Sequence, residues 1–267
     1  MSKVWAVSMM RDEEDVAYHV LQHLHEERVD GIIVADNRST DGTRDELERA
    51  KRDFRCRIMI VDDPVVAYLQ AEKMTRLAAL AAEQGADWIV PFDADELWVS
   101  RQAHLGETLR KLHHSVNVAQ SMMVNHFATD RDDLSDPNPF TRLRWRHPEW
   151  NPMGKVAFRW REGARLEQGN HEVHWDGDRT VLEGDLLIHH FPARSGEHLT
   201  RKARNGAEAY RAADLPDDMG AHWRQWGDLL DANPNAMHEV FAEHYTYPDP
   251  ESHGMVEDPA PWCRWTR

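Results

Sequence analysis

Two aspartates follow an apolar run in the first half of the chain. Asp93 and Asp95 stand one residue apart in the string FDADELW, directly after the run ADWIVP. The apolar run predicts a buried strand, so the two carboxylates stand where that strand ends. Mg²⁺ and Mn²⁺ prefer oxygen ligands and leave coordination positions for water and for the phosphate oxygens of a substrate. An Asp-x-Asp pair can equally cap a helix or end a strand at the surface, so the pair alone leaves both interpretations open.

Strand and helix patterns alternate along the first hundred residues. Short apolar runs predict strands, and apolar residues three or four apart predict helices. Strands and helices that alternate with short links predict an α/β fold with a mostly parallel sheet flanked by helices. We expect strands at residues 3–9, 31–37, 57–61 and 87–92, and helices at residues 14–27, from about 43, and at 67–84.

Polar residues follow each of these predicted strands. Parallel sheets of this class bind ligands beyond the carboxyl ends of their strands. The polar clusters are residues 10–13, 36–41, 62–63 and 93–96. The sequence therefore predicts one ligand site at this edge of the sheet.

Composition excludes several classes of protein. The formal net charge is −15, from 32 Lys and Arg against 47 Asp and Glu, and it disfavours binding to nucleic acid. Two distant cysteines, Cys56 and Cys263, make no disulfide framework and suit a reducing cytoplasm. Since no signal peptide and no membrane span of about 20 apolar residues is evident, we expect a soluble cytoplasmic protein.

Five segments in order resemble the family 2 type of glycosyltransferase, which has the Rossmann-like GT-A fold and binds nucleotide sugars. The segments are MMRDEED, DNRSTDGT, FDADELW, GNHEV and HFPARSGEHLTRKARNGAEAY. The resemblance implies an inverting, metal-dependent transfer of a sugar, of the hexosyltransferase type, from a nucleoside-diphosphate sugar to a hydroxyl acceptor. It also implies Mn²⁺ or Mg²⁺ as the cofactor.

The resemblance assigns the donor-binding residues. Asp36 matches a carboxylate that accepts from N3–H of a uracil-like base, which favours a UDP-sugar donor. The loop around the base and ribose matches Met10, Arg11 and Glu13, and Arg38 in the second segment is counted with them. An ordinary strand-to-helix turn would explain the same loop.

The metal and phosphate roles also follow from the resemblance. Asp95 is expected to contact the metal, and Asp93 the ribose or a metal-bound water. His190 matches the third ligand better than His189, and adjacent strand residues point to opposite faces, so only one of the pair can enter the site. A buried structural histidine is the competing interpretation. Basic residues that close over the diphosphate are expected to be Arg194 and Lys202, although a surface role for Lys202 remains open.

An inverting transfer needs a base that takes the proton of the acceptor hydroxyl. Glu172 in GNHEV is the better match, although relatives often have Asp there. His171 is the competing base, since an imidazole titrates near neutral pH. His174 and Trp175 are expected to line the sugar or acceptor pocket.

The second half of the chain is expected to serve the acceptor and catalysis. We expect a GT-A domain over residues 1–214, with residues 1–100 as the nucleotide-sugar half and 101–214 as the acceptor half. A C-terminal helical or irregular extension, residues 215–267, would pack on the domain or form a partner surface, for example in a homodimer. Further elements are expected at 106–114 (helix), 119–127, 154–160, 171–175 and 185–191 (strands), 195–211 (helix), and at 130–151 (an acceptor-side loop).

Other classes of function remain as alternatives. A metal-dependent hydrolase would explain the many histidines, but no HExxH spacing occurs. A nucleotidyltransferase would need a glycine-rich basic loop after the first strand, where this chain has MMRDEED. A catalytically degenerate module that only binds sugar nucleotides is the third alternative.

Overall fold

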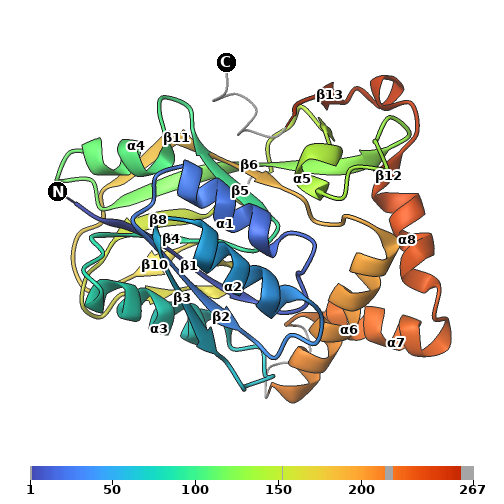
Figure 1. The fold of residues 1–267 in the computed structure, drawn as a ribbon, viewed down its shortest axis with the longest axis horizontal. Coiled ribbons are helices and arrows are strands. Elements are labelled where there is room, and N and C mark those ends of the chain that lie inside the picture. Colours follow the sequence, from blue (N-terminus) through green and yellow to red (C-terminus); the bar gives the residue numbers. More distant parts are fainter. Residues whose placement is uncertain (1, 152, 214–218, 260–267) are drawn as a thin grey trace.

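A computed structural model describes residues 2–151, 153–213 and 219–259, which form a central β-sheet with helices packed against it (Figure 1). The strands are β1 (Val4–Met10), β2 (Gly31–Asp36), β3 (Arg57–Asp62), β4 (Trp88–Pro91), β5 (Glu96–Ser100), β6 (Val118–Thr129), β7 (Trp145–Arg146), β8 (Val156–Arg159), β9 (Arg165–Leu166), β10 (Val173–His174), β11 (Val181–His190), β12 (Thr246–Tyr247) and β13 (Val256–Glu257). The α-helices are α1 (Ala17–Glu26), α2 (Thr43–Asp53), α3 (Gln70–Glu83), α4 (Leu105–Lys111), α5 (Pro139–Arg142), α6 (Gly196–Ala212), α7 (Ala221–Ala232) and α8 (Ala236–His244), with 3₁₀ turns η1 (Gln168–Asn170) and η2 (Pro250–His253).

The first strands form a parallel half-sheet in the order β3-β2-β1-β4. Because their carboxyl ends are aligned, Met10 lies opposite Asp36, and Asp36 lies opposite Asp62. The polar residues that follow these strands therefore meet at one edge. The α/β class predicted from the sequence is confirmed.

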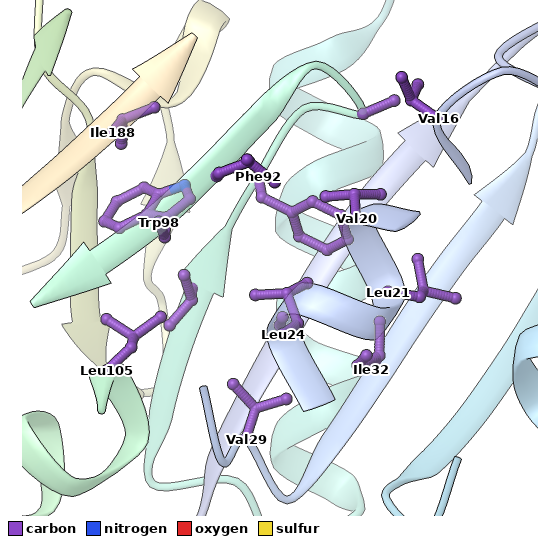
Figure 2. Close-up of a cluster of buried hydrophobic side chains, with 14 of the residues drawn as sticks. Val16, Val20, Leu21, Leu24, Val29, Ile32, Phe92, Trp98, Leu105 and Ile188 are labelled. Atoms are coloured by element: carbon purple, nitrogen blue, oxygen red, sulfur yellow. The ribbon is translucent and has the colours of Figure 1, made fainter. Parts of the chain in front are cut away.

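Helices cover both faces of this half-sheet. Side chains of β1 alternate between the faces: Ala6 and Met10 belong to the core under α1 and α2, whereas Trp5 and Val7 belong to the core under α3. Figure 2 shows the first core, where Val20 and Leu24 of α1 pack beside the strands. This packing fixes the position at which the loop after β1 begins.

The second half of the sheet is mixed. Strand β8 pairs antiparallel with β4 and with β6, and β11 lies parallel to β6. Strand β5 pairs antiparallel with β11, so residues 96–100 are a buried strand that the sequence patterns did not predict. The strand expected at 171–175 is shorter than predicted, Val173–His174, and pairs with β9 outside the main sheet.

Helix α6 begins at an N-cap, where the Ser195 hydroxyl accepts from the backbone N–H of His198 at 3.1 Å. Its apolar face packs on α7 and α8 through a separate small core that includes Leu199, Leu230 and Met237. Further along the tail, β12 pairs with β6 and β13 with β7. Of the expected extension, residues 215–218 and 260–267 lie outside the described residues, as does the domain boundary expected at 214.

Candidate functional site

The Asp-x-Asp motif forms a tight turn between β4 and β5. The backbone N–H of Glu96 donates to the Asp93 carbonyl at 3.1 Å, and the Glu96 carboxylate accepts from the Asp93 N–H at 3.1 Å. Asp95 is 5% exposed and Glu96 is 1% exposed. The turn therefore holds carboxylates in a buried position at the ligand edge of the sheet.

A candidate metal group consists of Asp95, Glu96 and His190, whose ligand atoms lie within 4.8 Å of one another. His190 reaches the turn because β11 pairs with β5, which sets His190 opposite Glu96. Its Nε2 lies 3.7 Å from Asp95 Oδ2, and its Nδ1 is hydrogen-bonded to Asn125 Oδ1 at 2.9 Å. Two carboxylates and an imidazole suit Mn²⁺ or Mg²⁺, and Asn125 orients the ring toward the carboxylate.

Of the predicted residues Asp93, Asp95 and His190, this group contains Asp95 and His190, and the role of Asp93 at the ribose or a metal-bound water stays a prediction. Asp93 is not among the three residues of this group, and its carboxylate accepts from the Lys155 ammonium at 2.6 Å. The same ammonium lies 2.6 Å from Glu96 Oε1. His189 points to the opposite face, where it is buried and hydrogen-bonded to His126.

Lysine ammonium groups balance the buried carboxylates. Lys202 of α6 donates to Asp95 Oδ2 at 2.7 Å and to the Pro192 carbonyl at 3.1 Å. Burial alone would raise the pKa of Asp95, but Lys202 and His190 outweigh it and hold that pKa well below its usual range. Asp95 is therefore ionised, as a metal ligand must be.

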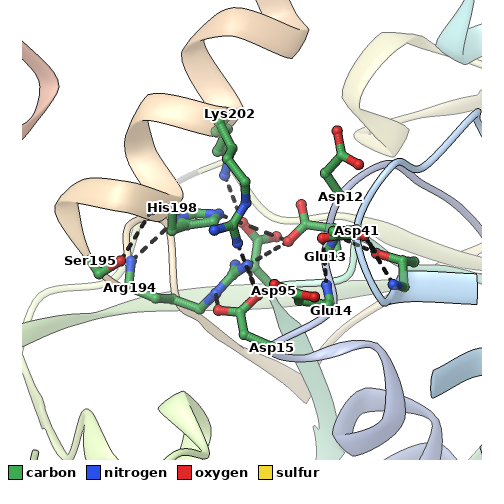
Figure 3. A network of polar contacts seen from close by, with 12 residues as sticks. Asp12, Glu13, Glu14, Asp15, Asp41, Asp95, Arg194, Ser195, His198 and Lys202 are labelled. Carbon is green, nitrogen blue, oxygen red and sulfur yellow. Dashed lines mark hydrogen bonds and ion pairs between the residues drawn. The ribbon is translucent and has the colours of Figure 1, made fainter. Parts of the chain in front are cut away.

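Arg194 is engaged by the acidic loop that follows β1 (Figure 3). Its guanidinium donates to both carboxylate oxygens of Asp15, at 2.8 and 2.9 Å, and also to Glu13. Burial is the largest influence on Glu13 and raises its pKa to about 7, against the opposing effect of Arg194. Because Arg194 is only 2% exposed, it joins the loop to α6 and would have to exchange partners to reach a diphosphate.

A cavity of about 180 Å³ opens beside this cluster. The predicted residues Arg11, Glu13 and Lys202 line it, but its Met residue is Met9 and not Met10. Met10 is 2% exposed and belongs to the core, because neighbouring strand residues point to opposite faces. The expectation that Met10 belongs to the loop around the base and ribose stays a prediction.

The other predicted donor residues lie at the border of the site. Asp36 is 8% exposed, and its carboxylate accepts from the Ser39 N–H at 3.1 Å and lies 3.4 Å from the Arg44 guanidinium. Arg38 is exposed. Neither lines the cavity; Asn37, between them in sequence, does.

The candidate bases lie on the turn before β10. The His171 Nδ1 is hydrogen-bonded to the Gly154 carbonyl at 2.9 Å, next to Lys155, which holds Asp93. Glu172 forms an ion pair with Arg179 at 2.9 Å. The expected pocket residues are elsewhere engaged: His174 is hydrogen-bonded to Glu167 at 2.6 Å, and Trp175 is a core residue.

Sequence reasoning missed several residues of the site. Glu96 and Lys155 were not selected, although Glu96 stands within FDADELW. Asn205 donates to Asp12 at 2.8 Å and stands three residues after Lys202, one helical turn away. The aromatic wall of the cavity consists of Tyr68, Tyr210 and Trp223, and the centres of the two tyrosine rings lie 4.4 Å apart in a stacked arrangement. The one sequence signal for this wall is that these aromatic residues stand in otherwise polar loop and helix segments.

Comparisons with known proteins return structures at low identity. No protein-family model matches the chain, and no curated protein matches it. A structure of glucosyl-3-phosphoglycerate synthase from Mycobacterium tuberculosis in complex with Mn²⁺, UDP and glucosyl-3-phosphoglycerate is 21% identical over 46% of this chain and 44% of that chain, with a TM-score of 0.34. S. aureus TarS 1–349 in complex with UDP is 13% identical over 84% and 69%, with a TM-score of 0.40, and a mycobacterial protein is 16% identical over 81% and 76%, with a TM-score of 0.39.

At these identities and scores, the likeness says nothing by itself about the activity of this chain. Within the described residues, no helix combines the length and the apolar character that crossing a membrane would require.

Proposed function

We propose that this chain transfers a sugar from a nucleoside-diphosphate sugar to a hydroxyl acceptor, with Mn²⁺ or Mg²⁺ as its cofactor. The observation that carries the proposal is the position of His190, whose Nε2 lies 3.7 Å from Asp95 Oδ2 at the edge where the parallel strands end. A buried, ionised aspartate and an oriented histidine beside a polar cavity form a site for a divalent metal and a phosphate ligand.

Asp95 and His190 would hold the metal, with Glu96 next to them. When bound, the ion supplies Lewis-acid neutralisation of the negative charge on the departing nucleoside diphosphate. Lys202 lines the cavity and contacts Asp95. Its ammonium can donate charge-assisted hydrogen bonds to a phosphate oxygen.

The cavity suits a nucleoside. Its walls combine the rings of Tyr68, Tyr210 and Trp223 with the polar side chains of Asn37 and Asn205, a combination that binds a flat base and a ribose. Uridine diphosphate is the favoured nucleotide. Because Asn37 lines the cavity and Asp36 does not, the base would have to reach past Asn37 for Asp36 at the end of β2 to accept from it.

An inverting reaction is the form that we propose, with Glu172 or His171 as the base. Glu172 would have to leave Arg179 to accept a proton, whereas His171 keeps Nε2 for this purpose while Nδ1 contacts Gly154. The two candidates can be separated by the pH dependence of Glu172→Gln and His171→Gln.

The test is calorimetric titration with uridine, guanosine and thymidine diphosphates, with and without Mn²⁺. Metal-dependent binding of one nucleotide to the wild type, lost in Asp95→Ala, supports the donor site. The matched control is Asp231→Ala, which removes a carboxylate whose side chain is 76% exposed on α7 and should leave binding unchanged.

The titration also separates the alternatives. If no nucleotide binds under any metal condition, the proposal fails and a hydrolase must be considered. If a nucleotide binds but the corresponding sugar nucleotide is neither hydrolysed nor used with any acceptor, the chain is a binding module.

A further inference from the structure

A second cavity, of about 290 Å³, shares no lining residue with the donor cavity. Its lining residues are Asn125, Phe127, His147, Glu149, Trp150 and Asn151. They come from β6 and from the loop between β7 and β8. None of them belongs to the five segments that carry the glycosyltransferase resemblance.

Strand β6 connects this cavity to the candidate metal group. Residues two apart on a strand point to the same face, so Asn125 and Phe127 stand side by side, and His126 points to the core. Asn125 is also the residue that contacts His190 Nδ1, at 2.9 Å. Only one side chain therefore separates the second cavity from the group proposed to hold the metal.

The walls of the cavity are aromatic, and the tail supports them. The ring of Phe127 contacts His147 edge-on at 5.2 Å and Tyr247 at 5.2 Å. Tyr247 belongs to β12, which pairs with the end of β6 (Figure 1). The C-terminal extension therefore supports one lining residue, Phe127, through Tyr247, which does not itself line the cavity.

Trp150 is the exposed part of the wall. It is 40% exposed, and the Arg101 guanidinium lies 4.6 Å from the centre of its ring. This cation–π contact holds the ring in place although the side chain is in a loop. A large aromatic ring held at the mouth of a polar cavity needs a reason, and binding a ligand is the common one.

We propose that this cavity binds the acceptor, and that the acceptor is a neutral sugar. This inference rests on the proposed function. Sugars present apolar C–H faces that pack on aromatic rings, and hydroxyl groups that bond to amides and carboxylates. Phe127, His147 and Trp150 supply the rings, and Asn151 and Glu149 supply the polar groups.

The charge of the lining favours a neutral acceptor over a phosphorylated one. Glu149 supplies a carboxylate to the lining, and no Lys or Arg is among the lining residues. An anionic acceptor would meet the Glu149 carboxylate in the lining, whereas the Arg101 guanidinium faces the Trp150 ring and is not among the lining residues. In the transfer, the acceptor oxygen bonds to the anomeric carbon, the bond from that carbon to the diphosphate oxygen breaks, and the hydroxyl proton passes to the base.

The test is saturation-transfer difference NMR on the full chain with UDP and Mn²⁺. The probes are methyl glycosides of glucose, galactose and mannose, with 3-phosphoglycerate as the anionic probe. At least one neutral glycoside should bind the wild type, and Trp150→Ala should weaken that binding at least about tenfold. Leu134→Ala is the control, because it removes an apolar side chain that is 86% exposed in the same half of the chain without touching the cavity.

UDP binding, followed in the same samples, separates the two proposals. If UDP binds but no neutral glycoside does, or if glycoside binding is equal in Trp150→Ala, the acceptor inference is overturned while the donor site stands. Binding of 3-phosphoglycerate that depends on Trp150 also overturns it. If UDP itself does not bind, the proposed function fails first.

Discussion

Replacing Lys155 by Met tests whether the buried charges around the Asp-x-Asp turn are arranged as described. The Lys155 ammonium lies 2.6 Å from Asp93 Oδ2 and 2.6 Å from Glu96 Oε1. Burial by itself would lower the pKa of Lys155, but the two carboxylates outweigh it and raise that pKa above its usual value. Both carboxylates therefore act on a cation that is almost fully enclosed.

The expected cost can be worked from the exposure of each partner. The Asp93 side chain is 37% exposed, so water can solvate it when the ammonium is lost, whereas the Glu96 side chain is 1% exposed. Removing one partner of a buried ion pair costs about 3–5 kcal/mol, because a buried charge is left unpaired. Since Glu96 alone is left in that state, we expect Lys155→Met to lower the free energy of unfolding by about 3 kcal/mol.

The assay is urea unfolding at pH 7.5 in a chelating buffer, so that no metal ion replaces the ammonium. Lys155→Met/Glu96→Gln should recover at least half of the loss, because the unpaired charge is gone. Lys51→Met is the control: this lysine is 49% exposed and 4.0 Å from Glu48, and its loss should cost less than about 0.5 kcal/mol. A cost of Lys155→Met no larger than that of Lys51→Met would refute the reasoning.

Further predictions concern the metal group, a close backbone approach and a buried histidine. Asn125→Ala should weaken Mn²⁺ binding about tenfold in electron paramagnetic resonance titrations, because the His190 ring loses the partner that orients it; unchanged affinity would contradict this. Gly154→Ala should cost about 2–3 kcal/mol in urea unfolding, since its Cβ would lie 1.9 Å from the Ser121 carbonyl oxygen. Burial lowers the pKa of His23 to about 4 from 6.5, so the unfolded chain binds a proton that the folded chain excludes. Stability should therefore fall by about 3 kcal/mol as the pH falls from 6.5 to 4, and His23→Gln should flatten that slope in denaturation measured at several pH values.

The first half of the fold could be predicted because its signals are local. Strands such as Gly31–Asp36 are buried along their whole length, so each appears in the sequence as a short apolar run between turn residues. The ligand edge then follows from the parallel order of the strands. Asp95 and His190 were selected on this basis together with the resemblance, and the structure brings them together.

The remaining features depend on contacts between distant segments. Strand β5 was missed because Glu96–Ser100 follows the acidic turn directly and becomes a strand only by pairing with β11. The role of Glu96 in the metal group depends on that pairing as well. Lys155 stands in a run that predicts a strand, and nothing in that run shows that its ammonium reaches back to Asp93 and Glu96. A motif does not show which face of a strand a residue occupies, so nothing in MMRDEED indicates that the side chain of Met9 lines the cavity.

Strand β6 limits how the two cavities can change during evolution or engineering. Asn125, which contacts His190, and Phe127, which lines the second cavity, are separated by one pleat repeat, about 7 Å along the strand. Inserting one residue between them would turn Phe127 toward the core unless a bulge took up the extra residue, as the register shift between Glu183 and Leu186 does where β11 pairs with β6. A change of the proposed acceptor preference is therefore more easily made in the loop that carries Trp150 or in the tail that carries Tyr247 than by insertion into β6. Exchange of that loop and tail between related chains is the rational route to a changed acceptor.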